Sequence, residues 1–335
     1  IGFVTWRDSQ MDYRWFFAQE SVMRFSDLVI GGLLIGGAVF MLPINDARGA
    51  EIKLDTDARN EPYVRVDGKI EKGDLKNIQR LAETIVSKDN RIAIRLNSKG
   101  GDIVEAIKIG KWVRKSLSRV VEIGGIIKPN EESKIRYCFS ACVLIYIGAA
   151  ERYLSLDNEF FTAAGGALYI RKNGKRVQKT IPVMGIHRPY YSKQYFAALS
   201  AKEAEKKYKT LEKLTREYLK SMGAPDTFIS EIFLIPSDEI KLVPRPEFTR
   251  MFPSKIPYLD QWLSDRCGKL SRSETRDLGV IQADRIIFSN GKLIPKGMSS
   301  GYVNYLINKS KKVRSCEQKT IIKHQKKILT ASKNQ

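Results

Sequence analysis

The chain has 335 residues, of which 43% are hydrophobic, and this suffices to bury the core of one domain with appendages or of two domains. Its net charge of +21 would suit an anionic partner, but no zinc-finger or RNA-recognition motif accompanies the lysines, so nucleic acid binding is disfavoured. The sequence has only two histidines, no Cys-x-x-Cys pair and no phosphate-binding or dinucleotide-binding glycine motif, which argues against a bound metal or cofactor.

An apolar run near the N-terminus predicts export. Residues 28–42 are almost all apolar, follow the basic Arg24 and precede a small-x-small cleavage site at Ala47 and Gly49. The run is shorter than the roughly twenty residues that span a bilayer, which favours a cleaved signal over an uncleaved anchor in the inner membrane. We therefore expect residues 1–50 to be a leader and the protein to be periplasmic or otherwise exported.

The chain after the leader alternates between strand and helix patterns. Residues 51–60 are polar and are expected to be loose. The strands predicted next are 63–66, 91–96 and 120–123, and the helices are 72–87 and one that starts at 102. Asp102 and Glu105 form a predicted capping pair for that second helix.

The same alternation continues after residue 140. The predicted elements are a helix at 141–149, a strand at 152–154, a hairpin within 161–180 turning at Asn173 and Gly174, a strand at 183–187, and a helix at 201–222 capped by Ser200 and Glu203. Such alternation predicts βαβ units, and therefore an α/β fold with a mostly parallel sheet covered by helices. We place the main domain at 51–245.

The remaining residues, 246–335, are predicted to be a less regular C-terminal extension. One helix is expected within 258–270. Residues 309–335 are lysine-rich and almost free of acids, so they form either a mobile or a helical tail. Such a tail would suit an anionic membrane surface.

Four cysteines in an exported chain suggest disulfides. Cys138 and Cys142 flank Ser140, and they are either a disulfide or two small buried residues beside a tight site. Cys267 and Cys316 lie in the C-terminal part and could pair with each other.

Three short stretches carry the candidate chemistry. At Gly100-Gly101 a strand turns into a helix, so backbone N–H groups are available to hold an anion or an oxyanion. Ser140 begins an apolar helix, whose dipole and the N–H of Ala141 favour developing negative charge. His187 ends an apolar strand, where catalytic groups gather in α/β sheets. Each stretch alone has an ordinary structural role, but together they predict an acyl-transfer site.

These three stretches resemble the proteolytic subunit of the Clp protease and its superfamily with the crotonases. They are more closely similar to exported Clp-protease-like proteins of bacteria, and the resemblance covers residues 62–243. It implies a spiral of ββα units and a catalytic mechanism based on serine. In it Ser140 would be the nucleophile, His187 the general base, and the amides of Gly101 and Ala141 the oxyanion hole.

The resemblance also implies an acid late in the domain. Asp238 is the nearest match, because Ile240 keeps an apolar residue two places on. Glu231 is the main rival, since glutamate can also orient a histidine, and Asp226 is a weaker one. If none of them reaches the histidine, the site is a dyad or is inactive.

The sequence departs from the family at Lys99, where proline is usual, although both glycines are retained. A Ser–Lys dyad, which would need a lysine near Ser140 such as Lys134 or Lys99, is a further alternative. The match of His187 to the family position disfavours that dyad.

The sequence thus predicts an exported serine peptidase that acts on peptides or proteins without a cofactor. The helix at 201–222 could support a homo-oligomer, but a ring around an energy-driven unfoldase is not expected outside the cytosol. The alternative is an inactive binding module on the same scaffold, which would hold an acidic partner or a membrane surface. Acyl-CoA chemistry of the crotonase kind is disfavoured by export.

Overall fold

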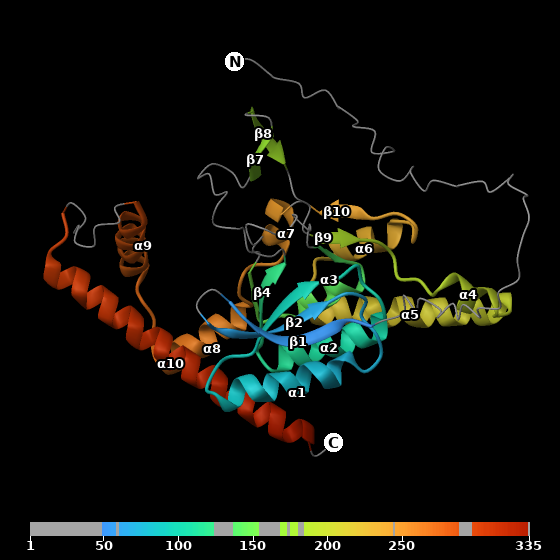
Figure 1. Cartoon of the computed structure of the whole chain (residues 1–335), viewed down its shortest axis with the longest axis horizontal. Coiled ribbons are helices and arrows are strands. Elements are labelled where there is room, and N and C mark those ends of the chain that lie inside the picture. The colour runs from blue at the N-terminus through green and yellow to red at the C-terminus, as the bar shows by residue number, and fades with distance from the viewer. Residues whose placement is uncertain are drawn as a thin grey trace, which may run out of the picture. The chain divides into compact units, whose positions relative to one another are not determined.

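A computed structural model of the protein (Figure 1) describes residues 49–57, 60–123, 137–153, 168–172, 175–179, 184–243, 245–287 and 297–333. The predicted signal at 28–42 lies outside these residues, so its cleavage and the export of the protein stay predictions. Among the helices of the described ranges, none combines the length and the hydropathy needed to cross a bilayer. The predicted domain boundaries at 50/51 and 245/246 also stay predictions.

A five-stranded sheet forms the centre of the described chain. In sheet order its strands are β1 (Glu51–Thr56), β2 (Pro62–Asp67), β3 (Ala93–Asn97), β4 (Arg119–Ile123) and β6 (Glu151–Arg152). The strands from β2 to β6 are parallel, and only β1 is antiparallel to its neighbour. The helices α1 (Asp74–Ser87) and α2 (Ile103–Lys115) connect β2 to β3 and β3 to β4. The predicted α/β fold with a mostly parallel sheet is confirmed.

Strand β1 corrects one prediction, because residues 51–60 were expected to be loose. The strand pairs with β2 in register from Glu51 opposite Asp67 onward. Its acidic residues are matched across the strands, since Arg65 lies 3.3 Å from a Glu51 carboxylate oxygen and 3.5 Å from one of Asp55. A strand at the edge of a sheet needs few apolar residues, and this explains its polar sequence.

The candidate serine and histidine directly follow two strands of a smaller sheet. Its order is β10 (Lys241–Val243), β9 (Met184–Ile186) and β5 (Cys138–Phe139). Strand β9 is antiparallel to β10 and parallel to β5. The predicted hairpin is confirmed as β7 (Leu168–Lys172) and β8 (Lys175–Lys179), although its turn residues 173–174 lie outside the described ranges.

The helix α3 (Ala141–Gly148) follows β5 directly, and every one of its residues is buried. It packs closely because glycines stand at its contacts. A Cβ on Gly148 would lie 2.5 Å from the carbonyl oxygen of Gly110 in α2, and one on Gly110 would meet the Tyr218 hydroxyl. Tyr218, from α5 (Ala201–Ser221), donates its hydroxyl to the Leu144 carbonyl at 2.7 Å. Helices α2 and α5 therefore hold α3 in one position.

The C-terminal part is more regular than its sequence pattern predicts. After α4 (Lys193–Ala197) and α5, the helices are α6 (Asp226–Leu234), α7 (Arg245–Met251), α8 (Pro257–Cys267), α9 (Arg272–Ile287) and α10 (Ser300–Lys333). The lysine-rich tail is helical, since α10 contains its residues 309–333, and α10 contacts α8 and α1 (Figure 1). The buried Gln325 of α10 accepts the backbone N–H of Ile92 at 3.0 Å, just before β3.

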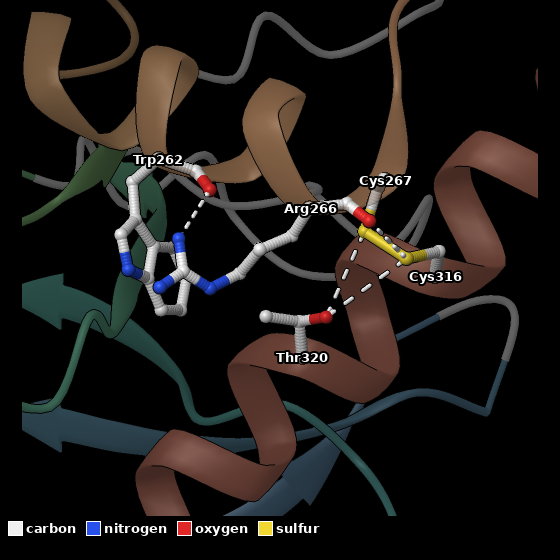
Figure 2. The surroundings of a disulfide bond; sticks show 5 residues. All are labelled: Trp262, Arg266, Cys267, Cys316 and Thr320. Carbon is white, nitrogen blue, oxygen red and sulfur yellow. Dashed lines mark hydrogen bonds between the residues drawn. A yellow bond between two sulfur atoms is a disulfide. The ribbon is translucent and has the colours of Figure 1, made fainter.

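A disulfide between Cys267 and Cys316 joins the end of α8 to α10 (Figure 2). Beside it the guanidinium of Arg266 lies 4.5 Å above the ring of Trp262 and also donates to the Trp262 carbonyl at 3.0 Å. The Thr320 hydroxyl lies 3.7 Å from the Cys267 sulfur. The pairing left open by the sequence is thus formed within the C-terminal part.

Candidate active site

The glycine turn after β3 lies directly against Ser140. Gly100 has φ +106°, a conformation that residues with a side chain rarely adopt, and its N–H donates to the Ser98 hydroxyl at 3.0 Å. A Cβ on Gly100 would lie 2.7 Å from the Cβ of Ser140 and 3.2 Å from the N of Ala141. The turn therefore needs glycine here in order to approach the first turn of α3.

Gly101 is held from the opposite side by Ile70. The Ile70 N–H donates to the Gly100 carbonyl at 2.9 Å, and the Ile70 carbonyl accepts the Asp102 N–H at 2.8 Å. This is the hydrogen-bond pattern of a parallel bridge, in which the N–H of Gly101 itself is directed away from Ile70. The N–H of Gly101 is thus not used by the pairing and can serve a ligand.

The predicted cap of α2 is confirmed, but its partner acts elsewhere. Asp102 accepts the Glu105 N–H at 2.8 Å, as expected for an N-cap. The Glu105 carboxylate does not return to Asp102. It accepts the N–H groups of Gly73 and Leu75, at 3.1 and 3.0 Å, and so caps α1. This contact fixes α1 against the start of α2, next to the glycine turn.

Ser140 has the backbone of a strained turn residue. Its φ of 54° and ψ of −122° lie outside the favoured regions of an L-residue, at a cost of about 1–3 kcal/mol. Its N–H donates to the Gly185 carbonyl of β9 at 2.8 Å. Although Ser140 occupies the N-cap position of α3, its side chain does not cap the helix, and its hydroxyl has no hydrogen bond to any described residue. The ordinary N-cap role is thus not the one that this side chain fills.

His187 leaves the neighbouring strand at the same end. Because Phe139 of β5 pairs with Gly185 of the parallel β9, Ser140 and His187 both follow these strands on one side, and such strands lie about 4.8 Å apart. The imidazole Nδ1 is 2.9 Å from the Arg188 carbonyl oxygen, which can only accept. Nδ1 therefore carries the proton, and Nε2 keeps a free lone pair.

The surroundings of His187 favour its neutral form. The residue is 8% exposed, and burial lowers the pKa of its imidazole below the usual value, while the hydrogen bond to the Arg188 carbonyl opposes this shift. Within the described residues, no hydrogen bond joins His187 to Ser140. Catalytic hydrogen bonds are often long without substrate, so this separation does not decide their roles.

The three candidate acids lie differently. Asp238 is exposed, and it lies three residues before Lys241, which pairs with Ile186; its segment therefore runs beside the segment that carries His187. Glu231 is engaged in an ion pair with Lys241. Asp226 is exposed in the first turn of α6. Within the described residues none of them contacts His187, whose Nδ1 partner is a backbone carbonyl, so the identity of the acid stays a prediction.

Of the two lysines considered for a Ser–Lys dyad, the structure describes one. Lys99 is exposed, and its ammonium lies 5.6 Å from the centre of the Tyr137 ring. Lys134 lies outside the described residues.

Two features near the site were not expected from the sequence. Ser98 is buried, and its hydroxyl binds both the N–H and the carbonyl of Gly100, so it fixes the turn. Glu105 was expected only as a partner of Asp102. A buried serine two residues before a Gly-Gly pair is a pattern that could have indicated the first of these. The pair Cys138 and Cys142 forms a disulfide, which decides between the two alternatives.

Comparisons with known proteins give a fold-level likeness only. No family model and no curated protein matches the chain. The chain is similar to a point mutant of ClpP1 from Listeria monocytogenes, with a TM-score of 0.34 and 18% identity, over 57% of this chain and 86% of that one. It is also similar to a point mutant of 1510-N, a membrane-bound stomatin-specific protease, with a TM-score of 0.32 and 12% identity, over 61% and 83% of the two chains.

Proposed function

We propose that the protein is a serine peptidase. Ser140 Oγ attacks the carbonyl carbon of a peptide bond, and His187 Nε2 takes the hydroxyl proton and later gives it to the leaving amine. The N–H groups of Gly101 and Ala141 stabilise the oxyanion of the tetrahedral intermediate. Peptides or proteins are the substrate class, and self-association through α5 stays a prediction.

The observation that carries this proposal is the conformation of Ser140 and its uncapped hydroxyl. A serine that adopts a strained backbone and does not use its hydroxyl to cap the helix that it begins has the geometry of a nucleophile on a strand-to-helix turn. Two further features support it. The glycine turn lies against the serine, and the neighbouring strand ends in a neutral histidine whose Nε2 is a proton acceptor.

The carboxylate of a triad has a substitute in this arrangement. In a Ser–His–Asp triad the acid accepts the Nδ1 proton and so fixes the tautomer of the histidine. The Arg188 carbonyl already accepts that proton here. We therefore propose that Asp238 contributes less than the dyad, and that Asp238→Asn retains most of the activity.

A fluorophosphonate probe tests the nucleophile. It should label the wild-type protein, and labelling should be lost in Ser140→Ala and strongly reduced in His187→Gln. The matched control is Ser87→Ala, which changes an exposed serine at the end of α1. Cleavage of a casein or fluorogenic peptide panel by the wild type, but not by Ser140→Ala, would establish the peptidase. Equal labelling of wild type and Ser140→Ala would end the proposal.

A second function, binding to an anionic membrane, is favoured by the surface of α10. Four exposed lysines follow one another at spacings of seven, four and four residues, which places them on one face of the helix. They are Lys312, Lys319, Lys323 and Lys327. Within the described residues none of them has an acidic partner at ion-pair distance. A lysine close to an anionic lipid surface contributes about 1 kcal/mol, so the set is sufficient for docking.

Sedimentation with vesicles tests this function. The protein should bind phosphatidylglycerol vesicles, but not phosphatidylcholine vesicles, and added salt should release it. Changing the four lysines to glutamine should weaken binding about a hundredfold or more. The control changes four exposed lysines of α5 to glutamine: Lys202, Lys206, Lys207 and Lys220. Equal losses in both variants, or equally tight binding to double-stranded DNA, would contradict a specific lipid surface.

A further inference from the structure

A disulfide spans the candidate nucleophile. Cys138 is the first residue of β5, Cys142 lies in the first turn of α3, and Ser140 stands midway between them. The Cα atoms of the two cysteines are 5.2 Å apart, and both residues are fully buried. The link therefore ties the strand to the helix across the one residue at which the chain changes from one to the other.

The backbone of Ser140 is strained and has to be held in place. Its positive φ is unfavourable for a residue with a side chain and persists only where the surroundings determine it. Hydrogen bonds hold both sides of the turn, from Ser140 N–H to the Gly185 carbonyl at 2.8 Å and from Val143 N–H to the Ser140 carbonyl at 3.0 Å. A covalent bond between the residues two before and two after adds a constraint that backbone hydrogen bonds alone do not supply.

We infer that the Cys138–Cys142 disulfide is a positioning element that keeps Ser140 reactive. It holds Ser140 in the conformation in which its hydroxyl does not cap α3. It also fixes the first turn of α3, so that the N–H of Ala141 stays available to the oxyanion. This inference rests on the proposed role of Ser140 as the nucleophile. The two cysteines do not touch the substrate, so their effect is exerted through Ser140 and Ala141.

Because the disulfide holds Ser140 in place, the reactivity of the site depends on redox conditions. Reduction by a dithiol such as dithiothreitol breaks the sulfur–sulfur bond, converts both sulfurs to thiols, and closes the reductant to its cyclic disulfide. A chain that folds where thiols are kept reduced never forms the link. We therefore expect the peptidase to reach its full reactivity only under oxidising conditions.

The second disulfide supplies a matched control. Cys267 and Cys316 join α8 to α10, elements that carry neither Ser140 nor His187. Loss of either bond lowers stability by releasing a constraint on the unfolded chain. Only loss of the Cys138–Cys142 bond should change the reactivity of the serine in molecules that remain folded.

The experiment measures the rate constant and the final extent of labelling by a fluorophosphonate. We compare the full-length wild type with Cys138→Ala/Cys142→Ala and with Cys267→Ala/Cys316→Ala. The first pair should lower the rate constant at least tenfold while nearly all molecules still become labelled. The second pair should stay within about twofold of the wild type. Near-ultraviolet circular dichroism at the assay temperature gives the folded fraction of each protein.

Reduction provides a variant that keeps both sulfur atoms, in case the alanine pair does not fold. Cys267→Ala/Cys316→Ala has one disulfide left, so refolding it with dithiothreitol should reproduce the loss of rate, and reoxidation should restore it. Faster hydrogen exchange of the Ser140 amide, which is bonded to Gly185, should accompany the reduced form.

The outcomes distinguish failure of the positioning role of the disulfide from failure of the proposed peptidase function. Equal rate constants for the two cysteine pairs, or a loss of rate that only follows the folded fraction, would overturn the positioning role and leave the peptidase standing. An oxidised wild type that is not labelled, or labelling that survives Ser140→Ala, would instead overturn the proposed function and the inference with it.

Discussion

At the scale of single residues, the candidate site depends on the absence of a side chain at Gly100. Ser140 occupies the space in which a side chain at position 100 would lie, and the turn also has a positive φ there. The two effects are separable, because Gly223 also has a positive φ, of 79°, but nothing lies within 4 Å of its absent Cβ. The pair of glycines therefore distinguishes backbone strain from contact with the serine.

Gly100→Ala should reduce both stability and reactivity, whereas Gly223→Ala should reduce only stability. Positive φ costs an alanine about 1–2 kcal/mol at either position, and the contact with Ser140 adds about 1–3 kcal/mol at position 100. The labelling rate of Gly100→Ala should fall at least about tenfold, since a shift of the serine by less than 1 Å misplaces its hydroxyl. Urea unfolding and fluorophosphonate labelling measure the two effects. Similar labelling rates for both variants would show that the turn does not support the serine.

The protonation of His187 gives a second prediction at this scale. Burial lowers the pKa of this imidazole, so the neutral base should persist to a pH below 6.5, and the labelling rate should rise with pH through a midpoint under that value. The unfolded chain binds a proton at His187 more readily than the folded chain, and its contribution to stability is therefore lost as pH falls below about 6.5. Rate profiles from pH 4 to 8 and unfolding of His187→Gln test this. A midpoint above 6.5 would contradict the burial argument.

At the scale of elements, one carboxylate connects two helices. Glu105 belongs to α2, is 3% exposed, and accepts the N–H groups of Gly73 and Leu75 at the start of α1. Asp74 lies in the first turn of α1, and burial, together with the neighbouring carboxylates of Glu105 and Glu71, raises its pKa. Both helices therefore begin at a common acidic contact, behind the glycine turn.

Glu105→Ala should destabilise the fold by about 1–3 kcal/mol, because it removes the charged acceptor shared by two part-buried N–H groups, those of Gly73 and Leu75. Glu105→Gln should lose less, since its amide oxygen can still accept from one of them. Urea unfolding with Glu239→Ala, which removes an exposed carboxylate, as control measures the difference. A loss in Glu105→Ala no larger than that in the control would mean that the two N–H groups are satisfied by other means.

At the scale of the whole molecule, the sequence predicts the elements that have a regular apolar period. It misses the elements that are stabilised by residues distant in the chain. The parallel strands and their crossover helices follow from apolar periods, because each element buries one face locally. Strand β1 was missed because its charges are matched only across the sheet, by Arg65. The regular helices of the extension were also missed, because α10 is held by single buried residues that contact remote parts of the sheet. Gln325, which binds the backbone of Ile92, is an example. The sequence motifs also predict that Ser140, His187 and the glycine turn share one site. They do not predict the partner of the His187 Nδ1, because that partner is a backbone carbonyl, which every residue has.

The contact at Gln325 decides whether the C-terminal extension unfolds with the main sheet. Gln325 is fully buried, its oxygen accepts the N–H of Ile92 at 3.0 Å, and its nitrogen donates to the Leu117 carbonyl at 3.5 Å. Gln325→Leu should therefore destabilise the protein by about 1–3 kcal/mol and speed hydrogen exchange at the Ile92 amide, because that N–H loses its acceptor in a buried position. Gln318→Leu, at an exposed position of the same helix, is the control. Unfolding should remain a single transition, since α10 packs on the sheet and on α1. Two separate transitions, with the sheet unaffected by Gln325→Leu, would instead make the extension a domain of its own.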